Sequence, residues 1–187
     1  AYSHGTQAPG GLTPRGGPLL KQLESAGIIL DVSHLAERAF WEALDVFGGR
    51  VLATHNCCRA LCEGDRQLDD AQLQALISRQ GVIGTAFDDW MLSPEWDHGA
   101  MDNTGITLET VVDHIDHVCQ IASSSKHAAI GTDLDGGYGR EQAPADLDTI
   151  ADLQRIPAIL DRRGYSQEDI ADIMHGNWIR TLREAWA

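Results

Sequence analysis

The stretch Ile28-Ile29-Leu30-Asp31-Val32-Ser33-His34 is a short, β-branched run that ends at a side chain able to bind a metal ion. The same pattern returns at residues 50–55 and 128–133, which end at His55 and Asp133. Apolar runs of this length, set off by glycine or polar residues, are typical of buried strands. With one further apolar run they predict four strands, at residues 28–33, 50–54, 82–87 and 128–132.

Helical patterns separate the expected strands. Capping residues predict helices that begin after Thr13, Ser33 and Asp69, with Pro14 at the first position of the first helix. Further helices are expected at residues 107–122, 147–163, 166–174 and 177–186, and a long loop at residues 88–104. This βα repeat predicts an α/β fold with a parallel sheet, about half of a (β/α)8 barrel of the TIM type. An open, doubly wound four-stranded domain fits the same pattern.

The bulk composition favours one domain, which we expect to be a single, partial barrel over residues 1–187. The chain has 187 residues and a formal net charge of −14, and this acidity argues against a nucleic-acid partner. No run approaches the roughly 20 apolar residues that span a bilayer. The first residues lack the basic and apolar regions of a signal peptide, so we expect a cytoplasmic location.

The cysteines give no sign of a disulfide framework. None of the four belongs to a CxxC pair, and Cys57 is adjacent to Cys58. We expect reduced thiols that pack as small apolar groups. A metal role for Cys57 or Cys58, close to His55, is the alternative.

Two histidines and an aspartate form the candidate site. His34 and His55 lie 21 positions apart, one strand–helix–strand step, so their imidazoles are expected side by side at the carboxyl ends of neighbouring strands. Neutral imidazole suits Zn²⁺ and similar divalent metals. Asp133 could take a proton from water activated by such a metal, or ligate the metal itself. Asp-x-Asp-Gly is also a good turn, and we assign that role to Asp135.

Three other polar residues have competing interpretations. Arg66, eleven positions after His55, could bind a substrate carboxylate in a bidentate manner, although composition alone favours a solvated arginine. His114 and His117 could share a helix face and form a metal pair, but no strand end places them on the catalytic side. We therefore interpret them as structural residues on the helix surface or between helices.

The motifs taken together resemble the renal (membrane) dipeptidase family of metallopeptidases, over nearly the whole chain and in the family's order. The segments that carry the resemblance are Gly11-Leu12-Thr13-Pro14, Leu30-Asp31-Val32-Ser33-His34, Ala53-Thr54-His55-Asn56, Asp65-Arg66-Gln67, Gly81-Val82-Ile83-Gly84, Val112-Asp113-His114-Ile115-Asp116-His117, Gly131-Thr132-Asp133-Leu134-Asp135-Gly136 and Met174-His175-Gly176-Asn177-Trp178.

This resemblance implies a (β/α)8 barrel with a binuclear zinc centre that hydrolyses dipeptides. His34 and His55 match two histidines that bind one zinc, so one ligand pair of the complete enzyme is present here. Asp133 matches an aspartate that handles the proton of the attacking water or the leaving amine. Arg66 matches an arginine that holds the substrate's terminal carboxylate.

The chain also departs from the family pattern. The His-x-Asp pair and the bridging glutamate of the family should lie upstream of the residues present, and His4 does not match the expected further histidine cleanly. Gln67 and Ala86 stand where asparagine is usual or frequent, which leaves substrate preference open. The chain therefore looks like the C-terminal half of such an enzyme, with strands 28–33 and 128–132 as open edges.

Three functional hypotheses follow from these observations. The first is a zinc dipeptidase, acting on a dipeptide substrate and incomplete as this chain alone. The second is a non-catalytic barrel fragment that serves as an assembly module. The third is another metal-dependent amidohydrolase, such as a deaminase or lactonase. The partners expected for the chain are a dipeptide substrate and either further copies of itself in a homo-oligomer or a missing N-terminal half.

Overall fold

Four parallel strands form the centre of the fold in the computed structural model, which describes residues 10–97, 99 and 103–187. The strands follow one another across the sheet in chain order: β1 (Leu30–Asp31), β2 (Val51–Asn56), β3 (Ile83–Thr85) and β4 (Ala128–Ile130). The predicted α/β fold is confirmed: four parallel strands flanked by helices form part of a TIM barrel.

Helices follow each strand, as the βα pattern requires. The α-helices are α1 (Gly16–Ser25), α2 (Glu37–Val46), α3 (Asp70–Ser78), α4 (Asp89–Leu92), α5 (Leu108–Ala122), α6 (Ile156–Arg162), α7 (Gln167–Ala171) and α8 (Asn177–Trp186). Short 3₁₀ turns are η1 (Ser125–His127), η2 (Arg140–Gln142) and η3 (Ile150–Arg155), and a π-helical turn, η4, spans Asp172–Gly176.

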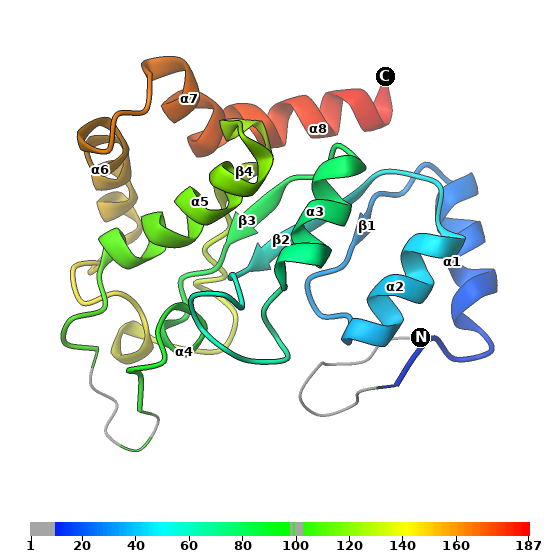
Figure 1. Cartoon of the computed structure of the whole chain (residues 1–187), viewed down its shortest axis with the longest axis horizontal. Helices are drawn as coiled ribbons and strands as arrows, with labels where there is room; N and C mark the ends of the chain where they lie inside the picture. Colours follow the sequence, from blue (N-terminus) through cyan, green and yellow to red (C-terminus); the bar gives the residue numbers. More distant parts are fainter. Residues whose placement is uncertain (1–9, 98, 100–102) are drawn as a thin grey trace.

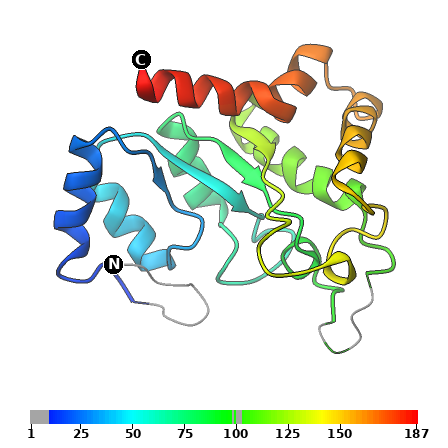
Figure 2. The ribbon, with the colours of Figure 1, turned by 180° about the vertical axis from the view of Figure 1, so that it is seen from behind.

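The helices α2, α3 and α5 lie on one side of the sheet, and Figure 2 shows the strands from the opposite side with α3 and α5 behind them. Fully buried side chains from these helices, such as Phe40, Leu73 and Ile115, pack against the sheet as one core. The arrowheads of β2 and β3 point to the end of the sheet where α4 lies (Figure 1). That end holds the carboxyl termini of the strands, where sites form in such folds.

The register of the sheet changes at the end of β2. Leu30 lies opposite Val51, and the β2–β3 pairing begins with Ala53 opposite Ile83. It then shifts between Ala53 and Asn56, the segment that carries His55. Such irregularities re-aim side chains at strand ends.

The start of α8 covers the outer edge of β4. The Asn177 side chain donates hydrogen bonds to the carbonyls of Ser125 and Ala128, at 2.8 and 2.9 Å. The Trp178 indole donates to the carbonyl of Ile130 at 2.9 Å. The expectation of an open edge at residues 128–132 is therefore wrong for the Ala128 and Ile130 carbonyls, which already accept hydrogen bonds from α8.

Several expected boundaries differ from those observed. β1 is limited to two residues, and α1 begins at Gly16, after a turn in which the Gly16 amide donates to the Thr13 carbonyl. The expected cap of Ser33 is wrong, because its hydroxyl bonds to Asp31 and α2 begins at Glu37. The expected loop at residues 88–104 contains α4.

The C-terminal helices also differ from expectation. The single helix expected at residues 147–163 is a 3₁₀ helix followed by α6, and Pro157 lies in the first turn of α6, where its missing amide hydrogen costs no helical bond. The separate helices expected at residues 166–174 and 177–186 are joined through η4, because Gly176 adopts helical backbone angles. Asp69 caps α3 as predicted and forms a capping box with Gln72, and Ser166 forms a capping box at the start of α7.

Candidate metal centre

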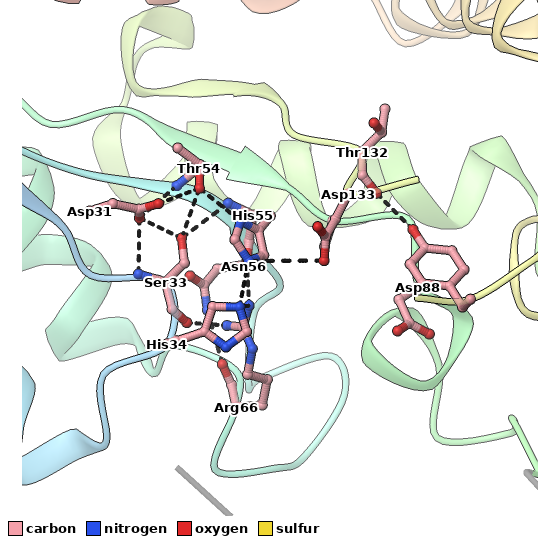
Figure 3. Close-up of polar contacts among 12 residues, drawn as sticks. Asp31, Ser33, His34, Thr54, His55, Asn56, Arg66, Asp88, Thr132 and Asp133 are labelled. Carbon is pink, nitrogen blue, oxygen red and sulfur yellow. Dashed lines mark hydrogen bonds and ion pairs between the residues drawn. The ribbon is translucent and has the colours of Figure 1, made fainter. Parts of the chain in front are cut away.

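The two histidines converge at the carboxyl ends of β1 and β2. Their Nε2 atoms lie 2.7 Å apart, and the ring centroids lie 4.8 Å apart with the planes tilted by 57°. Figure 3 shows both rings at one side of the sheet, with Asp133 directed toward them from beyond β4. The structure thus brings His34, His55 and Asp133 together, as the strand pattern predicts.

The imidazole pair fits two ligands of a zinc ion. In a tetrahedral site with Zn–N bonds of about 2.0–2.1 Å, two ligand nitrogens lie about 3.3 Å apart. His34 and His55 would therefore separate by about 0.6 Å to admit the metal. Among the described residues, no group of three His, Cys, Asp or Glu side chains is arranged to hold a metal. The described part of the chain therefore offers a candidate ligand pair and no group of three.

The electrostatic surroundings of His55 favour its neutral form. Burial lowers the pKa of His55, and the Arg66 guanidinium acts in the same direction, while the carboxylate of Asp133 opposes them. Neutral imidazole is the form that binds metals. His55 is therefore ready to act as a ligand without first losing a proton at neutral pH.

Asp133 occupies the loop that follows β4. Its Oδ2 lies 3.9 Å from His55 Nε2. Its backbone is left-handed, with φ of 56°, and its carbonyl accepts a hydrogen bond from the Gly136 amide at 2.7 Å. The turn spans residues 133–136 with Leu134 and Asp135 at its centre, so the turn role expected for Asp135 is present, and Asp133 begins the turn. Asp133 combines the turn with a carboxylate directed at the histidines.

Arg66 lies directly behind the histidine pair. The residue is only 4% exposed, so the solvated-arginine alternative is wrong. Its guanidinium donates to the carbonyl of Ser33 and, at 2.9 Å, to that of His55, and it lies 3.4 Å from His34 Nε2. The Asn56 side chain in turn donates to the Arg66 carbonyl at 2.9 Å. These contacts fix a positive charge beside the candidate ligands.

Two polar residues beside the histidines received no role from sequence reasoning. Asp31 and Thr54 form a hydrogen-bonded network with Ser33 that reaches His55 Nδ1 (Figure 3). The available signal was the polar Asp31 inside a short apolar strand and a hydroxyl residue next to His55.

The remaining candidates are structural. His114 is 1% exposed, accepts a hydrogen bond from the Cys58 amide at 3.0 Å and contacts the Leu92 carbonyl at 2.9 Å. It is therefore interior, not on the helix surface, while His117 pairs with Asp70. The four cysteines are free and buried, as predicted, and burial raises the pKa of Cys57, which disfavours the thiolate that binds metals. His4 lies outside the described residues.

Comparison with known proteins identifies the family of the chain. The whole chain, residues 1–187, matches the membrane dipeptidase family, peptidase family M19. The chain belongs to this family. It is 35% identical over 176 residues to an uncharacterized protein of Klebsiella pneumoniae, covering 94% of this chain and 62% of that protein. It is 32% identical over 174 residues to a dipeptidase of Claviceps purpurea, covering 93% of this chain and 38% of that protein.

A solved metallopeptidase structure has a similar fold. A metallopeptidase from Rhodobacter sphaeroides, crystallised with a phosphinate mimic of the dipeptide L-Ala-D-Ala, superposes with a TM-score of 0.85 at 26% identity. The match covers 99% of this chain and 52% of that one. This M19 chain thus spans about half the length of such relatives. No helix in the described segments is long and apolar enough to cross a membrane.

Proposed function

We propose that this chain provides one zinc-ligand pair, the proton-handling carboxylate and the substrate-carboxylate site of a zinc dipeptidase. The observation that carries the proposal is the approach of His34 and His55 Nε2 to 2.7 Å, with the Asp133 carboxylate 3.9 Å from the same His55 atom. Membership of the M19 family and the dipeptide mimic bound by the Rhodobacter sphaeroides enzyme support a dipeptide as substrate.

The residues would divide the work as follows. His34 and His55 would hold the metal, and the other ligands would come from outside the described residues. When bound, zinc supplies Lewis acidity at the scissile amide. The Asp133 carboxylate would accept the proton of the attacking water and return it to the leaving amine. The Arg66 guanidinium would attract the free carboxylate of a dipeptide, which would favour substrates with that group close to the scissile bond.

The second candidate is a non-catalytic assembly module. The observation that favours it is that the described residues offer two ligands, whereas catalytic zinc generally has three protein ligands. Under this hypothesis the barrel would be retained without dependence on zinc. The two candidates differ in a measurable way, because only the first requires the histidine pair.

The test compares zinc binding and hydrolysis in the natural full-length protein. His55→Gln removes one proposed ligand, and His117→Gln is the matched control, because His117 lies on α5 and pairs with Asp70. We expect His55→Gln to lower the zinc content and abolish Ala-Ala hydrolysis, while His117→Gln retains both. C-terminally amidated Ala-Ala should be a poor substrate of the unchanged protein. Equal zinc content and hydrolysis in both variants would contradict the proposal.

A further inference from the structure

A polar network lies behind His55, on the side of the ring away from Nε2 (Figure 3). The hydroxyl of Thr54 lies 2.7 Å from His55 Nδ1 and also contacts Asp31 Oδ2. Asp31 belongs to β1 and Thr54 to β2, so the network joins the two strands that present the histidines. Which nitrogen of His55 carries the proton depends on how the hydrogens of this network are distributed.

Asp31 accepts four hydrogen bonds. Its Oδ1 receives the Ser33 amide at 3.0 Å, the Thr54 amide at 3.1 Å and the Ser33 hydroxyl at 2.6 Å. Its Oδ2 receives the Thr54 hydroxyl. Burial alone raises the pKa of Asp31, but these hydrogen bonds outweigh it and the pKa is lowered. Asp31 is therefore an ionised carboxylate, which only accepts hydrogen bonds.

The hydroxyl groups of Ser33 and Thr54 each have one hydrogen, and both are donated to Asp31 in hydrogen bonds. The hydrogen of Thr54 points to Asp31 Oδ2, so toward His55 Nδ1 the Thr54 oxygen acts as an acceptor. The Ser33 oxygen likewise accepts from the His55 amide at 3.2 Å. The hydrogen between Thr54 and His55 therefore belongs to His55 Nδ1.

We propose that Asp31, acting through Thr54, is a positioning residue that keeps the proton of His55 on Nδ1 and the lone pair of Nε2 available for a metal. The 2.7 Å contact between the histidines is then a hydrogen bond donated by His34 Nε2 to His55 Nε2. Arg66 Nη2, 3.4 Å from His34 Nε2, then makes no hydrogen bond to it and donates to the His55 carbonyl at 2.9 Å. Ligating histidines commonly donate their other ring N–H to such a partner, which fixes both tautomer and orientation. The inference rests on the proposed function only for the statement that Nε2 binds zinc.

The substitution Asp31→Asn should reverse the tautomer. The Oδ1 position faces two backbone amides and the Ser33 hydroxyl, so the amide oxygen of asparagine must occupy it. The amide nitrogen then lies where Oδ2 was and donates to the Thr54 oxygen. The Thr54 hydrogen turns to His55 Nδ1, and the ring proton moves to Nε2, where it blocks coordination.

The readout is the ¹H–¹⁵N correlation spectrum of the metal-free chain labelled with [¹⁵N]histidine, which separates protonated from bare ring nitrogens. It is recorded at about pH 8, above the ordinary histidine pKa of about 6.5. His55→Gln identifies the signals of His55. We expect an Nδ1–H tautomer in the unchanged chain, an Nε2–H tautomer in Asp31→Asn and a mixture in Thr54→Val, which lacks the hydroxyl.

Two conservative variants serve as controls. Thr54→Ser keeps the hydroxyl, and Ser33→Ala removes a group that does not lie between Asp31 and His55 Nδ1, so both should keep the Nδ1–H tautomer. Circular dichroism verifies that each variant is folded. If Asp31→Asn does not fold, the comparison of Thr54→Val with Thr54→Ser tests the proposal instead. If the folded Asp31→Asn and Thr54→Val chains both retain the proton on Nδ1, the proposal is overturned.

Zinc affinity gives an independent measurement. Competition with a chromophoric chelator should show about 10–100-fold weaker zinc binding by Asp31→Asn than by Thr54→Ser, as for other losses of a ligand's hydrogen-bond partner. A loss of affinity without a change of tautomer would count against the inference. Absence of dipeptide hydrolysis in the full-length protein would refute the proposed function, but it would leave the tautomer result in place.

Discussion

Asp89 is a buried carboxyl group whose replacement should change the pH dependence of folding. It is the first residue of α4, it is 0% exposed, and neither carboxylate oxygen has a hydrogen-bond partner among the described residues. Burial, together with the neighbouring charge of Asp88, raises the pKa of Asp89 from 3.8 to about 7. The substitution Asp89→Asn keeps the shape of the side chain and removes its ability to ionise.

The expected magnitude follows from this shift. A difference of about three pKa units, at about 1.4 kcal/mol per unit, corresponds to ~4 kcal/mol. The folded chain holds the Asp89 proton more firmly than the unfolded chain. The stabilising contribution is therefore complete below the unfolded pKa of 3.8 and is lost as the pH rises through about 7. Asparagine does not ionise, so the free energy of unfolding of the Asp89→Asn chain lacks this decline.

Urea unfolding of both chains at a series of pH values provides the measurement. The free energy of unfolding of Asp89→Asn, relative to the unchanged chain, should rise by about 2–3 kcal/mol between about pH 5 and about pH 8. Titrating groups that do not interact with Asp89 are shared by both chains and cancel in the difference, while the neighbouring Asp88 remains coupled to it. The control is Asp45→Asn, since Asp45 is exposed on α2 and its replacement should leave the difference flat. A pH-independent difference for Asp89→Asn would refute the reasoning.

Three further changes have defined outcomes. Asp133→Asn should retain zinc in the full-length protein and lower kcat about 10²–10⁴-fold, because asparagine tolerates the left-handed backbone but cannot accept the proton. A near-normal kcat would show that Asp133 takes no part in proton transfer. Arg66→Ala should raise the KM for dipeptides more than for substrates without a free carboxylate; equal losses would contradict the carboxylate role. Gly131→Ala places a Cβ against the Thr54 carbonyl oxygen and should lower the free energy of unfolding by about 1–3 kcal/mol. Urea unfolding measures this loss, and the control is Gly17→Ala, whose Cβ meets open space.

The sequence predicted the features that depend on local periodicity. Four apolar runs, each with a helix behind it, were sufficient to predict the parallel sheet. The equivalent positions of His34 and His55 on consecutive strands were sufficient to predict that their rings meet. These predictions succeed because the carboxyl ends of parallel strands lie at one end of a sheet, whatever the details of packing.

Features that depend on contacts between distant segments could not be predicted from pattern. Arg66 is buried because the carbonyls of Ser33 and His55 accept its hydrogen bonds, and nothing in its own segment indicates this. The role of Asp31 requires the strand register that places it against Thr54. A π-helical turn at residues 172–176 joins two helices that were expected to be separate, because glycine can end a helix but can also adopt helical backbone angles, as Gly176 does.

The hydrogen bonds from Asn177 and Trp178 to β4 make the two ends of the sheet unequal. At β1, no strand among the described residues occupies the outer side, so a complementary segment can add there directly. At β4, an added strand must first displace the indole from the Ile130 carbonyl. The two edges of the sheet therefore differ in what must change before another strand can pair with them.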